Sequence, residues 1–124
     1  MQRKTTQREA IREAFTKAGR PLGPDEVFRS AKKRGSTLGI ATVYRAINDL
    51  LEEGWLQTVQ IPGEPARYEL KSLPHHHHFH CKKCGKVYDL KSCPGKLEAL
   101  APKGFVVQSH ELTLTGVCAD CGKN

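Results

Sequence analysis

The chain has 124 residues and a formal net charge of +7, and 38% of its residues are hydrophobic. That length suits one ordinary domain, or two small ones that need a metal or a partner subunit for stability. No stretch of about 18 apolar residues occurs, which excludes a membrane-spanning helix. The polar N-terminus lacks the apolar core of a signal peptide. We therefore expect a cytoplasmic protein with no membrane partner.

Positive charge is concentrated in the first part of the chain. Residues 1–48 carry eleven Lys and Arg against four Asp and Glu, whereas residues 49–70 carry one against five. Residues 71–124 carry eight against four. A basic segment is often only a solvated surface, but this surplus coincides with predicted helices, which favours nucleic acid as the partner.

Three helices are predicted within the basic segment. The first should begin at a capping box over residues 6–9, with Thr6 as N-cap, and end at Gly19. The second should run from Pro24 to Gly35, and the third from Gly39 to Gly54. The third helix carries apolar residues at helical spacing, namely Val43, Ile47, Leu50 and Leu51.

A predicted hairpin follows these helices. Two β-prone runs, residues 55–61 and 67–70, flank a turn of proline, glycine and glutamate. Three short helices and a hairpin predict a winged helix-turn-helix over residues 1–71. On the third helix Thr42, Tyr44 and Arg45 lie away from the apolar stripe, where they can contact bases or phosphates in a major groove. Helical hairpins with a polar face also occur in proteins that bind no DNA, so the prediction depends on the basic charge as well.

The character of the chain changes after a predicted hinge at residues 72–74. Residues 77–90 and 105–117 are predicted to form strands, with a short helix at residues 94–100 between them. The fold class is therefore α+β, a winged helix-turn-helix followed by a small β-α-β unit over residues 75–124. Such a unit is too small to bury much core by itself.

Four of the five cysteines form two C-x-x-C pairs, Cys81 with Cys84 and Cys118 with Cys121. Two such pairs can meet as a tetrahedral four-thiolate site for structural Zn²⁺. Each pair taken alone could be a redox dithiol, but in a reducing compartment paired cysteines are more often metal ligands than disulfides. Cys93 has no place in this scheme.

Five of the six histidines lie in residues 75–80, next to the first cysteine pair. Side chains alternate faces along a strand, so His75 and His77 should point one way and His76 and His78 the other. One strand can therefore serve two metal sites. His80 has no assigned role and is expected at the surface.

Four features, in order and spacing, resemble the ferric uptake regulator family of bacterial metal-dependent repressors. They are Gly-Ile-Ala-Thr-Val-Tyr-Arg at residues 39–45, Arg-Tyr-Glu-Leu at 67–70, the histidine run leading into Cys-x-x-Cys-Gly-Lys-Val at 81–87, and His110 eight residues before Cys118. The resemblance covers nearly the whole chain. It implies a homodimer that binds double-stranded operator DNA, with a C-terminal dimerisation domain, no enzymatic activity and no small-molecule substrate.

The resemblance also implies two histidine-containing metal sites. The regulatory hinge site would take its ligands from Glu69, His76, His78 and Asp89. The family also uses a histidine before the second helix, but Pro21 stands at that position here. Glu69, on the wing side of the hinge, could provide the link instead.

The second site would include three nitrogen ligands, from His75, His77 and His110. The family's fourth ligand there is a glutamate, and by ungapped spacing its position is occupied by Lys96, which cannot serve as an ordinary ligand. Cys93 and Glu98 both lie within about one helical turn of it. We favour Cys93, because three imidazoles and a thiolate suit Zn²⁺. A buried cysteine without metal is the alternative.

These inferences predict a metal-dependent DNA-binding transcriptional repressor that controls metal homeostasis. Zinc is the favoured inducing metal, with an iron-, manganese- or peroxide-responsive repressor as the alternative within the family. A zinc-ribbon adaptor that binds protein is the alternative from another class. An enzyme with a histidine-bound metal and Glu69 as base is disfavoured, because the chain has neither a nucleophile pattern nor a glycine-rich loop.

Overall fold

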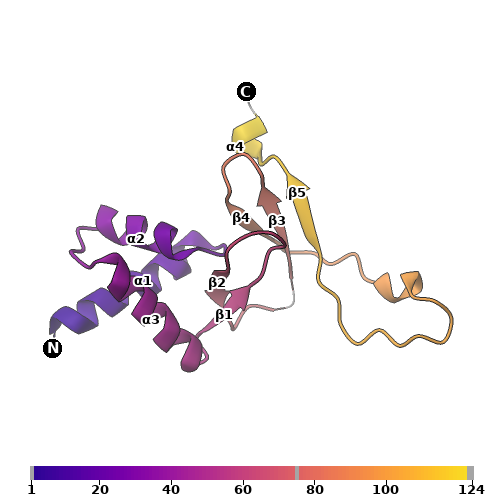
Figure 1. Cartoon of the computed structure of the whole chain (residues 1–124), viewed down its shortest axis with the longest axis horizontal. Helices are drawn as coiled ribbons and strands as arrows, with labels where there is room; N and C mark the ends of the chain where they lie inside the picture. The colour runs from indigo at the N-terminus through magenta and orange to yellow at the C-terminus, as the bar shows by residue number, and fades with distance from the viewer. Residues whose placement is uncertain (1, 75, 123–124) are drawn as a thin grey trace. The chain divides into compact units, whose positions relative to one another are not determined.

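The structure, a computed structural model, describes residues 2–74 and 76–122 (Figure 1). The chain divides into two compact units, with the boundary between Leu73 and Pro74. In chain order the elements are α1 (Gln2–Ala18), α2 (Pro24–Lys33), α3 (Ile40–Glu52), β1 (Leu56–Val59), β2 (Arg67–Leu70), β3 (His77–Cys81), β4 (Val87–Leu90), the 3₁₀ helix η1 (Leu97–Leu100), β5 (Thr113–Gly116) and α4 (Ala119–Gly122). This order confirms the α+β class. No described helix is long and apolar enough to cross a membrane.

The second unit is built on a three-stranded sheet in the order β4-β3-β5. The central strand β3 runs antiparallel to β4, with His78 opposite Asp89, and parallel to β5, with His78 opposite Thr113. The β3–β4 connection is closed by a hydrogen bond from the Gly85 N–H to the Cys81 carbonyl (2.9 Å). The strand predicted over residues 77–90 is thus a hairpin.

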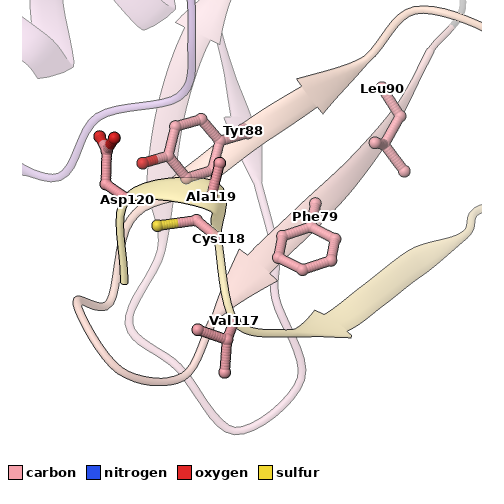
Figure 2. Close-up of a pocket in the computed structure, with 7 residues that line it drawn as sticks. All are labelled: Phe79, Tyr88, Leu90, Val117, Cys118, Ala119 and Asp120. Carbon is pink, nitrogen blue, oxygen red and sulfur yellow. The ribbon is translucent and has the colours of Figure 1, made fainter. Parts of the chain in front are cut away.

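The middle of one face of this sheet is apolar. Phe79 lies on the same face of β3 as His77 and Cys81, because side chains alternate along a strand. Its cross-strand neighbour is Tyr88 of β4, and Figure 2 shows the two rings on the surface that α4 borders. A Cβ added at Gly116 of β5 would lie 3.3 Å from Phe79 Cζ, so glycine leaves room for the ring.

The segment between β4 and β5 differs from the sequence prediction. A helix was expected over residues 94–100, but only the single turn η1 forms. Gly95 (φ +65°) and Lys96 (φ +50°) are left-handed, so no helix forms before residue 97. Ala101 is extended (ψ 147°), as the residue before a proline prefers, so the helix also ends at residue 100. The strand expected from residue 105 is wrong as well: Phe105 and Val106 are exposed and only Thr113–Gly116 pairs with β3.

His80 was expected at the surface, and this is wrong. Its exposed fraction is 8%. It lies on the central strand, opposite Val87 of β4 and Thr115 of β5. The central strand β3 is less exposed than the edge strand β5, and the sequence does not reveal which strand lies at the centre.

The helix ends of the first unit follow the local sequence signals, with one exception. The Gly23 N–H donates to Glu26 Oε1 (3.1 Å) at the start of α2, and α3 begins after Gly39. Gly54 has φ +80° and follows the end of α3, as a left-handed stop should. The exception is Thr6: α1 already begins at Gln2, so Thr6 is not its N-cap. Gln, Arg and Lys are good helix formers, and they extend the helix through the predicted cap.

The hairpin of the first unit is joined to the segment before α2. Strands β1 and β2 pair antiparallel, with Leu56 opposite Leu70. Leu22 and Tyr68 exchange two backbone hydrogen bonds of 2.9 and 2.8 Å. Because of this bridge Pro21, at the position where the resemblance implies a histidine, lies buried directly beside the β1–β2 hairpin.

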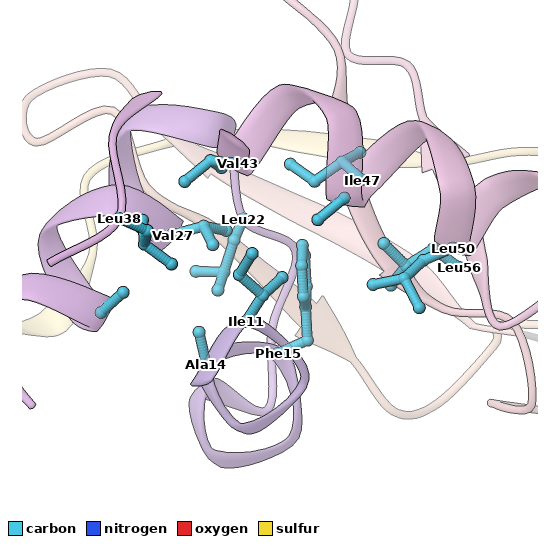
Figure 3. Close-up of a cluster of buried hydrophobic side chains, with 12 residues drawn as sticks. Ile11, Ala14, Phe15, Leu22, Val27, Leu38, Val43, Ile47, Leu50 and Leu56 are labelled. Atoms are coloured by element: carbon cyan, nitrogen blue, oxygen red, sulfur yellow. The ribbon is translucent and has the colours of Figure 1, made fainter. Parts of the chain in front are cut away.

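The core of the first unit gathers the apolar stripes of all three helices (Figure 3). Ile11 and Phe15 from α1 meet Val27 from α2 and Ile47 from α3, all at most 3% exposed. Trp55 packs on this core, with its ring centroid 6.4 Å from that of Phe15. The stripe predicted on the third helix is therefore confirmed as the face that packs inward.

We predict that Ile47→Ala lowers the free energy of unfolding of the first unit by about 2–5 kcal/mol, because a fully buried aliphatic side chain leaves a cavity. Trp55 is the sole tryptophan, so its fluorescence during urea unfolding reports on this unit. Ile40→Ala is the control, since Ile40 is 38% exposed and should change stability by no more than about 0.5 kcal/mol. Equal effects of the two substitutions would contradict the core assignment.

Candidate metal centres

The two C-x-x-C pairs come together in the second unit as a four-cysteine cluster, Cys81, Cys84, Cys118 and Cys121. The four sulfurs lie within 4.8 Å of one another, and those of Cys84 and Cys118 are 3.9 Å apart. Sulfurs bonded to one zinc at about 2.3 Å in a tetrahedron would lie about 3.8 Å apart. The cluster therefore fits a zinc ion.

Backbone amides stabilise a thiolate in this cluster. Cys81 Sγ accepts hydrogen bonds from the N–H groups of Cys84 (3.4 Å) and Cys118 (3.3 Å). These amides lower the pKa of Cys81 to about 5, whereas the neighbouring Cys118 sulfur raises the pKa of Cys121 to about 12. The directions of these shifts make Cys81 the thiol that loses its proton more readily and Cys121 the one that holds it. Zinc binding must displace the Cys121 proton, so zinc affinity should fall as the pH falls.

The second cluster contains His77, Cys93 and His110. Cys93 Sγ lies 3.3 Å from His77 Nε2 and 3.1 Å from His110 Nε2, and the two nitrogens are 3.2 Å apart. Of the two residues considered for the fourth ligand, the structure brings Cys93 to the histidines, whereas Glu98 lies exposed on η1 and belongs to no ligand cluster of the described residues. His75 lies outside the residues that the structure describes.

The spacing of the His77–Cys93–His110 cluster is close to that of a zinc site. Bond lengths of about 2.0–2.1 Å to nitrogen and 2.3 Å to sulfur give tetrahedral separations of about 3.3 Å (N to N) and 3.6 Å (N to S). One contact opposes coordination: the Leu112 N–H donates to His77 Nδ1 (3.1 Å), which places the proton of the neutral ring on Nε2. Metal binding through Nε2 would therefore break this hydrogen bond.

The third cluster lies on the opposite face of β3 and contains His76, His78 and Asp89. Asp89 Oδ1 is 3.3 Å from His76 Nε2 and 3.6 Å from His78 Nε2. His76 Nδ1 is 2.7 Å from the Pro74 carbonyl, so it is the nitrogen that carries the proton and donates to this oxygen. The lone pair of His76 is then on Nε2, facing Asp89, as a metal ligand requires.

Glu69, the remaining expected ligand of the hinge site, belongs to the first unit. It lies on β2 opposite Gln57 of β1, whose side-chain amide donates to Glu69 Oε2 (2.8 Å). A carboxylate that accepts this bond keeps further lone pairs for a metal.

The predicted DNA-contacting residues lie on the solvent side of α3. Tyr44 is 51% exposed, although an aromatic ring of this size is usually buried to a large extent. Arg45 Nη2 lies 3.3 Å from Thr42 Oγ1, so these two residues share one exposed patch. The arrangement leaves a phenol, a guanidinium and a hydroxyl available for a groove.

Two backbone groups that support the histidines were not identified from the sequence: the Pro74 carbonyl at His76 and the Leu112 N–H at His77. A main-chain group has no residue type that reveals it. Only the paths of the hinge and of the segment before β5 bring these groups to the rings.

We predict that Cys84→Ser and Cys121→Ser each lose the structural zinc together with dimerisation, because each removes one thiolate from a closed site whose binding energy is folding energy. Cys93→Ser is the matched control and should retain this zinc. Metal content by mass spectrometry and molecular mass by sedimentation would measure both effects. A zinc-free variant that stays a fully stable dimer would refute the structural role.

Known proteins share this sequence and fold. The profile of the ferric uptake regulator family matches residues 2–115. The chain is 34% identical over 122 residues to the ferric uptake regulation protein of Campylobacter jejuni, which covers 94% of this chain and 78% of that protein. It is also 34% identical over 111 residues to the ferric uptake regulation protein of Neisseria meningitidis, with 86% and 76% covered.

Solved structures agree with these sequence relatives. The ferric uptake regulator of Francisella tularensis with iron superposes with a TM-score of 0.70 at 35% identity, covering 93% of this chain and 90% of that chain. The described order of a winged helix-turn-helix and a C-terminal dimerisation domain is that of these regulators. The chain therefore belongs to the ferric uptake regulator family, whose members are metal-dependent transcription regulators and not enzymes.

Proposed function

We propose that this protein is a homodimeric repressor that binds operator DNA when a regulatory divalent metal is bound, with zinc as the inducing metal. The observation that carries the choice of zinc is the position of Cys93 Sγ, 3.1 and 3.3 Å from two imidazole nitrogens. Thiolate ligands favour zinc over manganese and iron(II), which accept carboxylates more readily.

The three clusters have different parts in this proposal. The four-cysteine cluster holds a structural zinc that joins the β3–β4 hairpin to the C-terminal α4. The His77–Cys93–His110 cluster, with His75 as a further ligand, binds the metal that sets selectivity. His76, His78 and Asp89, together with Glu69, form the regulatory hinge site.

The hinge site gives the metal its control over DNA binding. Glu69 comes from the wing hairpin and the other ligands from the second unit, so a metal bound by all four would favour one arrangement of the two units. The free energy shared between metal and DNA sites in such systems is typically about 1–3 kcal/mol and acts in both directions. DNA would therefore tighten metal binding by the same factor.

Helix α3 would enter the major groove, where Tyr44 contacts a base and Arg45 a phosphate. In a homodimer two such helices read two half-sites, and the spacing of the half-sites must match that of the helices. The surplus of seven positive charges in residues 1–48 supports an electrostatic contribution to this binding.

Iron is the rival inducing metal. The Campylobacter and Neisseria relatives are named for ferric uptake regulation, and Asp89, a hard carboxylate ligand, stands beside His76 and His78. If the hinge site sets the response and takes iron(II), the same switch would respond to iron, with zinc confined to the four-cysteine cluster.

We predict that Tyr44→Ala relaxes sequence preference, whereas Arg45→Ala weakens binding to all sequences alike, because base contacts specify and phosphate contacts position. Affinities for operator and random duplexes, measured over a range of salt concentrations, separate these effects. Wild-type affinity should fall steeply with salt, and Arg45→Ala should reduce the salt slope by about one. Binding that is insensitive to salt would point to a protein-binding adaptor.

We predict that Cys93→Ala lowers the zinc affinity of the His77–Cys93–His110 cluster roughly ten-fold or more. Removing a group that only hydrogen-bonds to a metal ligand already lowers metal affinity by about that factor, and removing a ligand should cost at least as much. Competition with a zinc chelator measures the affinity, and the four-cysteine zinc should remain. His76→Ala is the matched variant on the other face of β3 and should abolish metal-dependent DNA binding. If Cys93→Ala leaves the preference for zinc over manganese unchanged, the argument for zinc fails but the repressor remains.

A further inference from the structure

Ile40, the first residue of α3, is an apolar side chain that does not belong to the core cluster of the first unit. It is 38% exposed, and Tyr44, one turn further along the helix, is 51% exposed. Among the described residues of the first unit, Leu73 is the one other large hydrophobic side chain that is comparably exposed, and it lies outside the helices. The exposed apolar surface of the helices is therefore gathered at the N-terminal end of α3.

The packing role that an apolar residue commonly has at a helix start is filled by other residues. Leu38 directly precedes the N-cap Gly39, and Val43 is the fourth residue of the helix. Apolar residues at these two positions commonly pack on each other and fix how the chain enters the helix. Leu38 and Val43 are both buried in the core cluster, as Figure 3 shows. The start of α3 therefore does not need Ile40 for packing.

Ile40 extends the exposed side of α3 toward the N-terminus of the helix. Residues four apart are neighbours on a helix surface, so Ile40 lies beside Tyr44. The exposed positions within residues 40–48 are Ile40, Ala41, Tyr44, Arg45 and Asn48. This set contains the two residues that the proposed function assigns to a base and a phosphate.

The distribution of charge on α3 suits the approach of this end to DNA. Residues 40–48 contain no aspartate or glutamate. The acids Asp49 and Glu53 lie at the other end of the helix and accept hydrogen bonds from Arg8 of α1, at 2.7 and 3.1 Å. Negative charge is thus kept away from the half of the helix that carries Ile40.

An aliphatic side chain has one matching group in the major groove of DNA, the C5 methyl of thymine. The other base-edge groups there are hydrogen-bond donors and acceptors, which lose their bonds to water when an apolar group covers them. In helix-turn-helix proteins the N-terminal residues of the recognition helix reach the base edges. An exposed isoleucine at this position would therefore favour thymine.

We propose that Ile40 is a specificity-determining residue that recognises the C5 methyl group of one thymine in each operator half-site. Contact between the two apolar groups removes both from water and selects thymine over cytosine, which presents an amino group in the groove and no methyl. This inference rests on the proposed function, and it adds an apolar contact to the base contact of Tyr44.

Deoxyuridine tests the contact, because uracil differs from thymine only in lacking the C5 methyl. Zinc-loaded full-length protein first selects an operator from random duplexes, and each thymine is then replaced by deoxyuridine at equivalent positions of both half-sites. At one position the loss of a buried methyl should weaken binding about four-fold in each half-site, and so roughly fifteen-fold for the dimer. Fluorescence anisotropy of labelled duplexes measures the affinities.

Ile40→Ala removes the partner of the methyl and should bind the thymine and uracil duplexes alike at that position. It should keep its preference for thymine wherever another side chain reads the methyl, so the double-mutant cycle assigns the contact. Arg45→Ala is the matched control on the same helix. It should weaken binding to both duplexes by the same factor and leave their ratio unchanged, because a phosphate contact carries no sequence information.

The outcomes separate this inference from the function on which it rests. If Ile40→Ala keeps the full preference for thymine over uracil at every position, the assignment to Ile40 is wrong. A wild-type protein that binds its operator but tolerates uracil at every position also contradicts it. If wild type selects no duplex at all, the DNA binding of the proposed function fails instead.

Discussion

The alternation of side chains along β3 is the constraint on which the rest of the second unit depends. His77, Phe79 and Cys81 share one face, so one candidate metal cluster, the apolar pocket beside Phe79 and the four-cysteine cluster follow each other along it. His78 lies on the other face of β3 and pairs with Asp89 of β4. A shift of register by one residue would move each ligand to the wrong face, and every cluster would lose its members at once.

The two units differ in what stabilises them. The first unit has an apolar core drawn from three helices and the hairpin. Among the described residues of the second unit, the only buried hydrophobic ones are Cys81 and Val87. Such a unit cannot offset its loss of conformational entropy by apolar burial alone. Metal binding at the candidate clusters and contact with a partner subunit are the sources of stability that the proposed function would add.

This difference suits a regulator. A first unit with its own core can keep α3 folded whether or not metal is present, so side chains proposed to contact DNA, such as Tyr44, stay exposed. A second unit that needs metal and a partner would make the geometry of the dimer, and not the fold of the helices, the quantity that metal controls. Small changes at the ligands then have large effects, because half-site spacing on DNA is strict.

The sequence by itself determined the helices of the first unit, the hairpin, the family and the two cysteine pairs, because these depend on local spacing: glycine at the end of α3, apolar residues such as Val43 and Ile47, and paired thiols. For the fourth ligand of the second site, it left two candidates near Lys96, the thiol of Cys93 and the carboxylate of Glu98. Only the tertiary structure brings one of the two close to His77 and His110: the left-handed Gly95 and Lys96 keep Cys93 out of the helix, and the path of the chain carries Cys93, not Glu98, to the two imidazoles. Burial of His80 and exposure of Phe105 were likewise decided by tertiary packing, because a side chain's contact with water depends on which strands lie beside it.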